Sequence, residues 1–524
     1  MSSILVCISN NLKHDMRVLR QVGAFADTFE KVVVCARPIP DRTEHFQADN
    51  VEWVWFENDI VPDEKRIRRL AEKYGVYEEL TGIAPVILDD CVLGNAEKIE
   101  FDRRLQDTMM SHPRWDEVRK GIPAEETDDN QVYWMLFNLD LILKWADLVA
   151  GLDAEYIYCN DYDTLLCGVV HKRIHGSRFV YDEHDLYCDA FPYLFPAIYR
   201  RFIALFEFEF IKYADAVITV SESAVKWLKE TYDLADTPLF VPNCKDVNEE
   251  PPASSAEIKY PIRLYFQGIA DEGKGLGDVI EALKYTEEAV LHLRCLESDY
   301  VTGLKKYVSD NDLGEKVRFF DPVSPYDVIA AANEDGDIGL TITGGETSIG
   351  IRNTITNKLI EYLTAGLPVI VSEEMRDQSG IVSKYDAGFV IGANIKEGLE
   401  RVFKEIRETP GVLEKKSRNA KQAADTLFRW EIYKERFLDL VLGKNAEEVS
   451  KSPETRQNIT YEDLKADRDI LKKLFFIAME NRNEIVLEAK KLELEIQELK
   501  ESNSWRAGRL VTRPARMIKR IFRK

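Results

Sequence analysis

The sequence has no long, uninterrupted apolar run. The apolar stretch near its start, Ile4 to Ile8, is short and follows no basic leader. A signal peptide needs a longer apolar segment behind basic residues, and a membrane-spanning helix needs about twenty apolar residues. We therefore expect a cytoplasmic protein with neither a secretion signal nor a membrane span.

Closely spaced cysteine pairs are also missing. The 8 cysteines are scattered along the chain without Cys-x-x-Cys spacing, mostly inside apolar runs that resemble strands. Disulfide-rich proteins and zinc sites usually show such pairs. The sequence therefore predicts reduced, buried thiols, with neither a disulfide framework nor a structural metal.

Positive charge is scarce over most of the chain. The sequence holds 70 Lys and Arg residues against 92 Asp and Glu, a formal charge of -22. This balance argues against a nucleic-acid-binding body. Residues 504–524 are the exception, because they carry many basic residues, interleaved with Trp505, Ile521 and Phe522, and no acid. This composition predicts an amphipathic helix on an anionic membrane surface.

Strand-like and helical patterns alternate along the first 445 residues. Ile4–Ile8, Arg17–Phe29 and Lys31–Cys35 read as a strand, a helix and a strand, and a second such series starts at Ile262. With 45% hydrophobic residues, a chain of 524 can bury two ordinary α/β cores. The predicted fold is α/β, with two tandem Rossmann-like domains at residues 1–245 and 256–445.

Two segments depart from this alternation. Residues 62–129 are charged and helical, and we interpret them as an insertion in the first domain. In residues 455–503, apolar residues recur every seventh position from Leu464 to Leu499. This heptad pattern predicts a coiled coil that joins copies of the chain, the alternative being one long helix packed on the body.

The segment from Asn357 to Ser372 reads as a helix, a Gly-Pro turn and a buried strand. Leu359, Ile360 and Leu363 are spaced for one apolar helix face, so Lys358, Glu361 and Tyr362 are expected to point elsewhere. Gly366 is expected to end the helix. The pattern is that of an active-site helix, but a generic helix-turn-strand unit would look the same.

The chain resembles the GT-B glycosyltransferases, in particular the retaining family 4 enzymes, over about residues 1 to 440. The motifs that carry this resemblance follow in the family's order: residues 15–19 (Asp-Met-Arg-Val-Leu), 181–186 (Tyr-Asp-Glu-His-Asp-Leu), 214–221 (Ala-Asp-Ala-Val-Ile-Thr-Val-Ser), 268–276 and 335–340. Each motif is weak by itself, and their order and spacing make the resemblance specific. It implies a nucleotide-sugar donor bound by the second domain.

A nucleotide sugar presents a ribose diol and a diphosphate, and each needs a different partner. Glu361 can accept both ribose hydroxyls, as the matching family glutamate does. Lys274, in the loop that starts at Gly268, can neutralise the diphosphate. Asn357, Lys358 and Arg352 are further donor-binding candidates, as is Ser348 in the Gly-rich loop 343–350.

The chain departs from the family pattern at three positions. Asn353 stands where many family members have a glutamate, and Glu346 is the candidate that replaces it. Ile269 stands where an arginine is frequent. Asn160 stands where a histidine often precedes the aspartate matching Asp161. His184 then becomes the favoured acceptor-side group, so the catalytic candidates are His184, Asp161 and Glu346, the alternative for His184 being a core histidine.

No residue is evident as a covalent nucleophile. Retention fits a front-face displacement in which the departing phosphate oxygen takes the acceptor proton. Residues 161–163 read Asp-Tyr-Asp, but they lie in the wrong domain for a donor metal, and the resemblance implies metal-independent transfer without a cofactor.

The terminal Ser504 to Arg509 run resembles the Ser-Trp-Arg segment of bacterial cell-surface polysaccharide glycosyltransferases. We therefore expect a hexosyltransferase-like enzyme, peripheral on the inner face of the cell membrane, that acts on a lipid-linked or growing glycan. Two alternatives stay open: a GT-B nucleotide-sugar epimerase, and a catalytically silent GT-B scaffold.

Overall fold

The computed structural model describes residues 2–10, 12, 15–38, 48–56, 64–83, 128–187, 197–245, 260–344 and 349–444. The chain divides into the units Met1–Tyr461 and Glu462–Lys524, and all that follows concerns the first. The predicted coiled coil at 455–503, the basic tail at 504–524 and most of the 62–129 insertion lie outside the described residues. Those assignments stay predictions.

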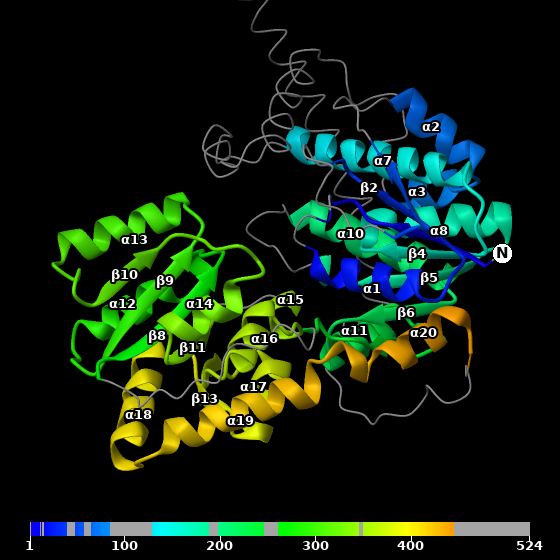
Figure 1. Ribbon diagram of the computed structural model, residues 1–524. Helices are drawn as coiled ribbons and strands as arrows, with labels where there is room; N and C mark the ends of the chain where they lie inside the picture. Colours follow the sequence, from blue (N-terminus) through cyan, green and yellow to red (C-terminus); the bar gives the residue numbers. More distant parts are fainter. Residues whose placement is uncertain are drawn as a thin grey trace, which may run out of the picture. The chain divides into compact units, whose positions relative to one another are not determined.

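Among the described residues, a sheet of seven parallel strands forms the first domain, in the order β3-β2-β1-β4-β5-β6-β7. Figure 1 labels β2, β4, β5 and β6 of this sheet. Its strands are β1 (Ser3–Cys7), β2 (Lys31–Ala36), β3 (Val51–Trp55), β4 (Tyr156–Asn160), β5 (Arg178–Glu183), β6 (Ala216–Thr219) and β7 (Leu239–Phe240). The helices between them are α1 (Met16–Ala26), α2 (Glu64–Lys73), α3 (Tyr77–Ile83), α7 (Asp128–Ala150), α8 (Tyr162–His175), α10 (Ala197–Phe210) and α11 (Glu222–Thr231).

The second domain holds a sheet of six described parallel strands, in the order β10-β9-β8-β11-β12-β13. These are β8 (Ile262–Gly268), β9 (Ala289–Cys295), β10 (Val317–Phe320), β11 (Ile338–Thr341), β12 (Val369–Ser372) and β13 (Gly388–Ile391). Its helices are α12 (Leu276–Leu283), α13 (Asp299–Asp310), α14 (Val328–Asp335), α15 (Ile349–Arg352), α16 (Asn357–Thr364), α17 (Arg376–Tyr385), α18 (Ile395–Glu408) and α19 (Val412–Leu427).

The composition of the central strands explains the parallel sheets. Strands such as β1 (Ser-Ile-Leu-Val-Cys) and β12 (Val-Ile-Val-Ser) are apolar on successive residues and buried almost throughout. A strand of this kind needs helices on both faces of its sheet, which the crossovers of a parallel sheet supply. The predicted α/β fold with two Rossmann-like domains is confirmed.

The chain crosses between the domains twice. After β7 it runs through Lys245 into the second domain, and after α19 it returns, forming a parallel bridge between Lys245 and Arg429. The last described helix, α20 (Lys434–Leu442), packs against α1 of the first domain. Trp430, Phe437 and Val441 lie in the first domain's core.

The segment Asn357–Ser372 forms the helix and strand that its sequence predicts. Gly366 lies at a φ of +76° after the helix, a conformation that glycine adopts most readily. The expected direction of Tyr362 is wrong, because its side chain is fully buried against Tyr265 and Gly339. Since α16 lies between the sheet and α19, it buries more than one of its faces.

Two further expectations bear on the described part of the chain. Its six cysteines, Cys7, Cys35, Cys159, Cys167, Cys244 and Cys295, are all free and buried, as the sequence predicts. No helix in the described ranges is long and apolar enough to span a membrane.

Candidate functional site

A cavity of about 660 Å³ opens where side chains from both domains meet. From the first domain it is lined by residues that include Asn10, Asp15, Arg20, Asp161, His184, Asp185 and Tyr187. Asn243 and Lys245 line it from the connecting segment, and Phe266, Ile269, Lys274, Asn357, Lys358 and Glu361 line it from the second domain. It lies at the carboxyl ends of parallel strands, the usual ligand position in such sheets.

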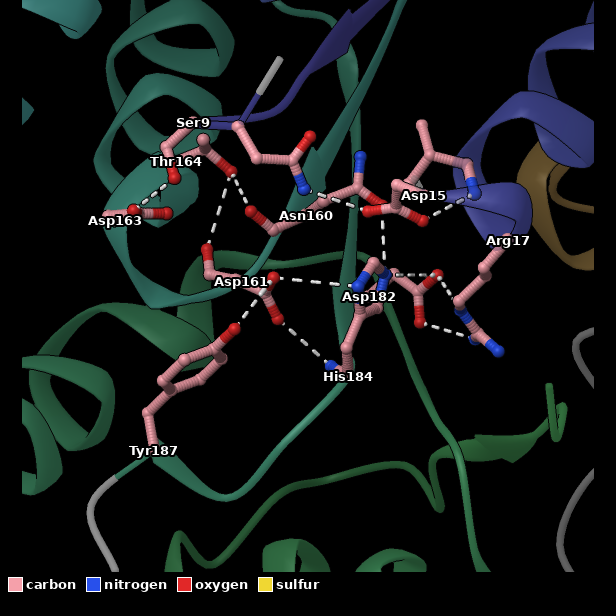
Figure 2. Close-up of polar contacts among 12 residues, drawn as sticks. Ser9, Asp15, Arg17, Asn160, Asp161, Asp163, Thr164, Asp182, His184 and Tyr187 are labelled. Atoms are coloured by element: carbon pink, nitrogen blue, oxygen red, sulfur yellow. Dashed lines mark hydrogen bonds and ion pairs between the residues drawn. The ribbon is translucent and has the colours of Figure 1, made fainter. Parts of the chain in front are cut away.

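A buried ion pair supports the first-domain side of this cavity. The Arg17 guanidinium, at the start of α1, contacts both carboxylate oxygens of Asp182 on β5, at 3.0 Å from Nε and 2.7 Å from Nη2 (Figure 2). Gln21 and Tyr158 also donate to Asp182, each at 2.7 Å. Burial alone would raise the pKa of Asp182, but Arg17 and His184 hold it below its usual range.

His184 lies between this ion pair and Asp161. Its Nε2 is 3.3 Å from Asp182 Oδ2 and 3.2 Å from Asn160 Oδ1, and its Nδ1 is 3.5 Å from Asp161 Oδ2. Burial disfavours the charged ring, yet the carboxylates of Asp161 and Asp182 outweigh it and raise the pKa of His184 to about 9. The ring is therefore an imidazolium at neutral pH.

Asp161 follows β4 and has an unusual backbone conformation. Its φ of 63° and ψ of 163° lie in a region that residues other than glycine rarely enter, at a cost of about 1–3 kcal/mol. Its carboxylate accepts hydrogen bonds from the His184 backbone N–H at 3.0 Å and from the Tyr187 hydroxyl at 3.3 Å. Burial, opposed by His184 but reinforced by Asp163, raises the pKa of Asp161 to about 7.

On the second-domain side, Gly268 ends β8 beneath Lys358. Gly268 has a φ of +95°, and a Cβ there would lie 3.3 Å from Lys358 Cε. The Lys358 ammonium lies 4.8 Å from the centre of the Phe266 ring. Burial, together with the nearby Lys274 ammonium, lowers the pKa of Lys358 to about 8. Two cations thus face one region of the cavity.

Glu361 is held from two directions. The Gln267 side-chain amide donates to Glu361 Oε2 at 2.6 Å, and Lys245 Nζ is 3.6 Å from Oε1. One helical turn earlier, Asn357 Oδ1 accepts a hydrogen bond from the side chain of Asn243 at 2.7 Å. The connecting segment therefore contacts the same helix that presents Glu361 to the cavity.

The loop that carries Lys274 touches the segment after β11. Gly344 N–H donates to the Gly273 carbonyl at 2.9 Å, and a Cβ on Gly344 would lie 2.9 Å from the Gly275 Cα. Only a residue without a side chain permits this approach. Lys274 Nζ is 3.9 Å from Asp271 Oδ2, so its charge is only loosely paired there.

Most of the predicted site residues meet in this cavity. Its lining includes Asp161, His184, Lys274, Asn357, Lys358 and Glu361, and Gly268 lies directly below Lys358. Arg352 is not among the described residues that line it, and Glu346 and Ser348 lie outside the described residues. Asn353 is buried, and its backbone carbonyl accepts a hydrogen bond from Ser221.

Sequence reasoning missed Asn243 and Lys245, which follow the short strand β7. The available signal was two polar residues shortly after β7, separated by Cys244, but nothing in this sequence shows that the connecting segment reaches Glu361. Within the described ranges, no group of three or more His, Cys, Asp or Glu side chains is placed to hold a metal ion.

Comparisons with known proteins agree with this architecture. Residues 108–249 match the model of Glycosyltransferase Family 4, while no curated protein matches the chain in sequence. The structure is similar to sucrose-phosphate synthase of Thermosynechococcus elongatus, with 13% identity, a TM-score of 0.57, and coverage of 84% of this chain and 99% of that one.

It is also similar to HepE of Anabaena in complex with UDP and glucose, with 14% identity, a TM-score of 0.55, and coverage of 84% and 100% of the two chains. A glycosyltransferase of Rickettsia africae gives 10% identity, a TM-score of 0.54, and coverage of 85% and 99%. The chain therefore has the fold of the GT-B glycosyltransferases, and residues 108–249 in its first half are similar to Glycosyltransferase Family 4.

Proposed function

We propose that this chain is a glycosyltransferase that moves a hexose-like sugar from a nucleotide-sugar donor to a lipid-linked or growing cell-surface glycan, with retention. One observation carries the proposal: the cavity sets a carboxylate and two lysines of the second domain opposite Asp161 and His184 of the first. Structures of HepE with UDP and with UDP-glucose support a nucleotide sugar as the donor.

Glu361 is the proposed ribose ligand. A carboxylate can accept hydrogen bonds from both hydroxyls of a diol, and Gln267 fixes the orientation of this one through its 2.6 Å hydrogen bond. Lys245, at 3.6 Å, lies close enough to exchange this contact for one to the bound nucleotide. Asn357 is the proposed donor-binding neighbour on the same helix.

Lys274 and Lys358 are the proposed diphosphate ligands. Burial and the nearby Lys274 ammonium lower the pKa of Lys358, and a diphosphate between the two ammonium groups would relieve their repulsion. Cations placed before the reaction stabilise the charge that develops on a departing diphosphate, and they need no metal to do so. We propose metal-independent transfer on this ground, with Arg352, Ser348 and Glu346 as further donor-side candidates.

The acceptor and the location rest on the sequence alone. The basic amphipathic residues 504–524 favour attachment to the inner face of a membrane, where lipid-linked glycans are exposed. The heptads of residues 455–503 favour a homo-oligomer. The chain offers no such argument for an epimerase, which needs neither an acceptor nor a membrane.

Calorimetry of UDP, GDP, dTDP and ADP with the full-length chain, without added metal, tests the donor site. We expect one nucleotide to bind selectively, and we expect Glu361→Ala and Lys274→Ala each to weaken it by about ten- to a hundredfold, since hydrogen bonds to charged groups contribute about 1.5–3 kcal/mol. Glu400→Ala, an exposed change on α18, is the matched control. If the wild-type chain binds no nucleotide, the transferase proposal is wrong and the scaffold interpretation replaces it.

A further inference from the structure

The Asp161 side chain does not cap the helix that it precedes. Aspartate at an N-cap position usually accepts a hydrogen bond from a backbone N–H in the first turn, but at the N-cap of α8, where the residues are described, the Asp161 carboxylate accepts none. Its carboxylate is directed instead to the His184 backbone N–H and the Tyr187 hydroxyl, on the wall of the cavity. The unusual backbone conformation of Asp161 therefore serves to aim this carboxylate at the cavity.

His184 has oxygen acceptors at both ring nitrogens. Asn160 donates its side-chain amide to the Cys7 carbonyl at 3.0 Å, which turns its Oδ1 toward His184 Nε2. Asp182 lies beside the same nitrogen, and Asp161 lies beside Nδ1, as Figure 2 shows. A ring that carries a proton on each nitrogen satisfies all three contacts, and it has no lone pair left with which to take a proton from a substrate.

The buried Asp182 carboxylate fixes the position of the His184 ring. Asp182 is 0% exposed and receives hydrogen bonds from Arg17, Gln21 and Tyr158, so its carboxylate cannot turn away from the imidazole without losing them. The His184 cation is therefore held beside Asp161 by a rigid set of buried groups.

We propose that Asp161 binds the attacking hydroxyl of the acceptor, and that His184 is a positioning residue that keeps this carboxylate in place and ionised. This assignment rests on the proposed glycosyltransferase function and deepens it. Asp161 reaches the cavity from the first domain, opposite Lys274, Lys358 and Glu361 of the second. An acceptor hydroxyl that is hydrogen-bonded to Asp161 would thus face the anomeric carbon of a donor held by those second-domain residues.

The transfer step balances without a further reactant. The acceptor oxygen forms a bond to the anomeric carbon as the bond from that carbon to the phosphate oxygen breaks. The bonding electrons leave with the nucleoside diphosphate, whose departing oxygen takes the hydroxyl proton. Before transfer, Asp161 orients the hydroxyl by accepting its hydrogen bond. As the new bond forms, this single proton leaves that hydrogen bond for the departing oxygen, so Asp161 is ionised before and after the step.

The charged groups around Asp161 make this role sensitive to pH. His184 faces it from the end of β5, Asp163 faces it from α8, and Asp185 and the Tyr187 hydroxyl lie on the segment after β5. Burial and the two aspartates favour the protonated carboxyl, whereas the His184 cation favours the carboxylate. Because the pKa of Asp161 is about 7, transfer should weaken as the pH falls below neutrality.

Hydrolysis of UDP-glucose, GDP-mannose, dTDP-glucose and ADP-glucose by the full-length chain tests the assignment, with water as the acceptor and nucleotide release as the signal. Asp161→Asn should slow hydrolysis of the preferred donor by about tenfold or more and leave the Kd of the matching nucleoside diphosphate unchanged. The matched control is Asp236→Asn, an exposed change in the same domain.

His184→Gln separates positioning from mere structural support. Glutamine can still donate one hydrogen bond to Asp161 but carries no charge, so the acid limb of the pH–rate profile should move to higher pH. Unchanged hydrolysis in Asp161→Asn, or an equal loss at every pH in His184→Gln, would overturn the assignment and leave the donor site intact. Absence of nucleotide binding in the wild-type chain would instead overturn the proposed function, and the role of Asp161 with it.

Discussion

Replacing Arg17 by methionine should destabilise the first domain severely. Methionine keeps much of the apolar stem of arginine but removes the charge that faces Asp182, a carboxylate that is 0% exposed. Breaking a buried ion pair by removing one partner costs about 3–5 kcal/mol, because the other charge stays buried. Gln21, Tyr158 and His184 still contact Asp182 in the variant. We therefore expect the lower end of this range, about 3 kcal/mol.

Urea unfolding at pH 7, followed by circular dichroism, measures the effect. The control is Lys31→Met, which removes an ion pair of similar length, 2.7 Å to Glu52, whose side chains are more than half exposed. Exposed pairs contribute about 0–1 kcal/mol, so this control should unfold nearly as the wild type does.

The difference in unfolding free energy between Arg17→Met and the wild type should also depend on pH. The pKa of Asp182 is lower in the folded chain than in the unfolded one. Its stabilising contribution is therefore complete above the unfolded value of about 3.9 and is lost as the pH falls below it. This difference in unfolding free energy should be constant from pH 7 to pH 5 and should become smaller toward pH 3. Equal stability of the two methionine variants, or a gap that does not narrow, would refute the reasoning.

Two further predictions concern the second domain. Gly388→Ala should destabilise it by about 3 kcal/mol or more, because the new Cβ would lie 2.0 Å from the Val369 carbonyl oxygen; Gly380→Ala on α17, with no atom within 4 Å, should stabilise it by about 0.5–1 kcal/mol in the same urea assay. Nucleoside diphosphate affinity should fall between pH 7 and 9, since Lys358 loses its proton with a pKa of about 8. The arginine of Lys358→Arg keeps its charge between pH 7 and 9, so calorimetry should find that the affinity of this variant changes less with pH. An equally steep fall in affinity would contradict the role of Lys358.

The sequence predicts the fold well because its signals are local. Runs such as Val32 to Cys35 specify buried strands wherever they lie, and Gly366 marks the end of α16 through its own backbone preference. The donor-side candidates were also readable, because Asn357, Lys358 and Glu361 belong to one short segment.

The contacts between distant segments could not be read in this way. Arg17 and Asp182 each stand in a recognisable motif, but they are 165 residues apart, and neither motif indicates that the two side chains form an ion pair. The backbone conformation of Asp161 has no residue signature either, since aspartate rarely adopts it. Lys245 reaches Glu361 only because the connecting segment crosses the end of α16.

The return of the chain to its first domain has a consequence for synthesis. A ribosome delivers residues in order, and Trp430, Phe437 and Val441, which complete the first domain's core, emerge only after the whole second domain. Until then, the face of α1 that α20 covers stays exposed to water. A fragment that stops at residue 245 lacks α20, so that apolar face of α1 stays uncovered in it. The last described helix, α20, thus completes the core of the domain that is synthesised first.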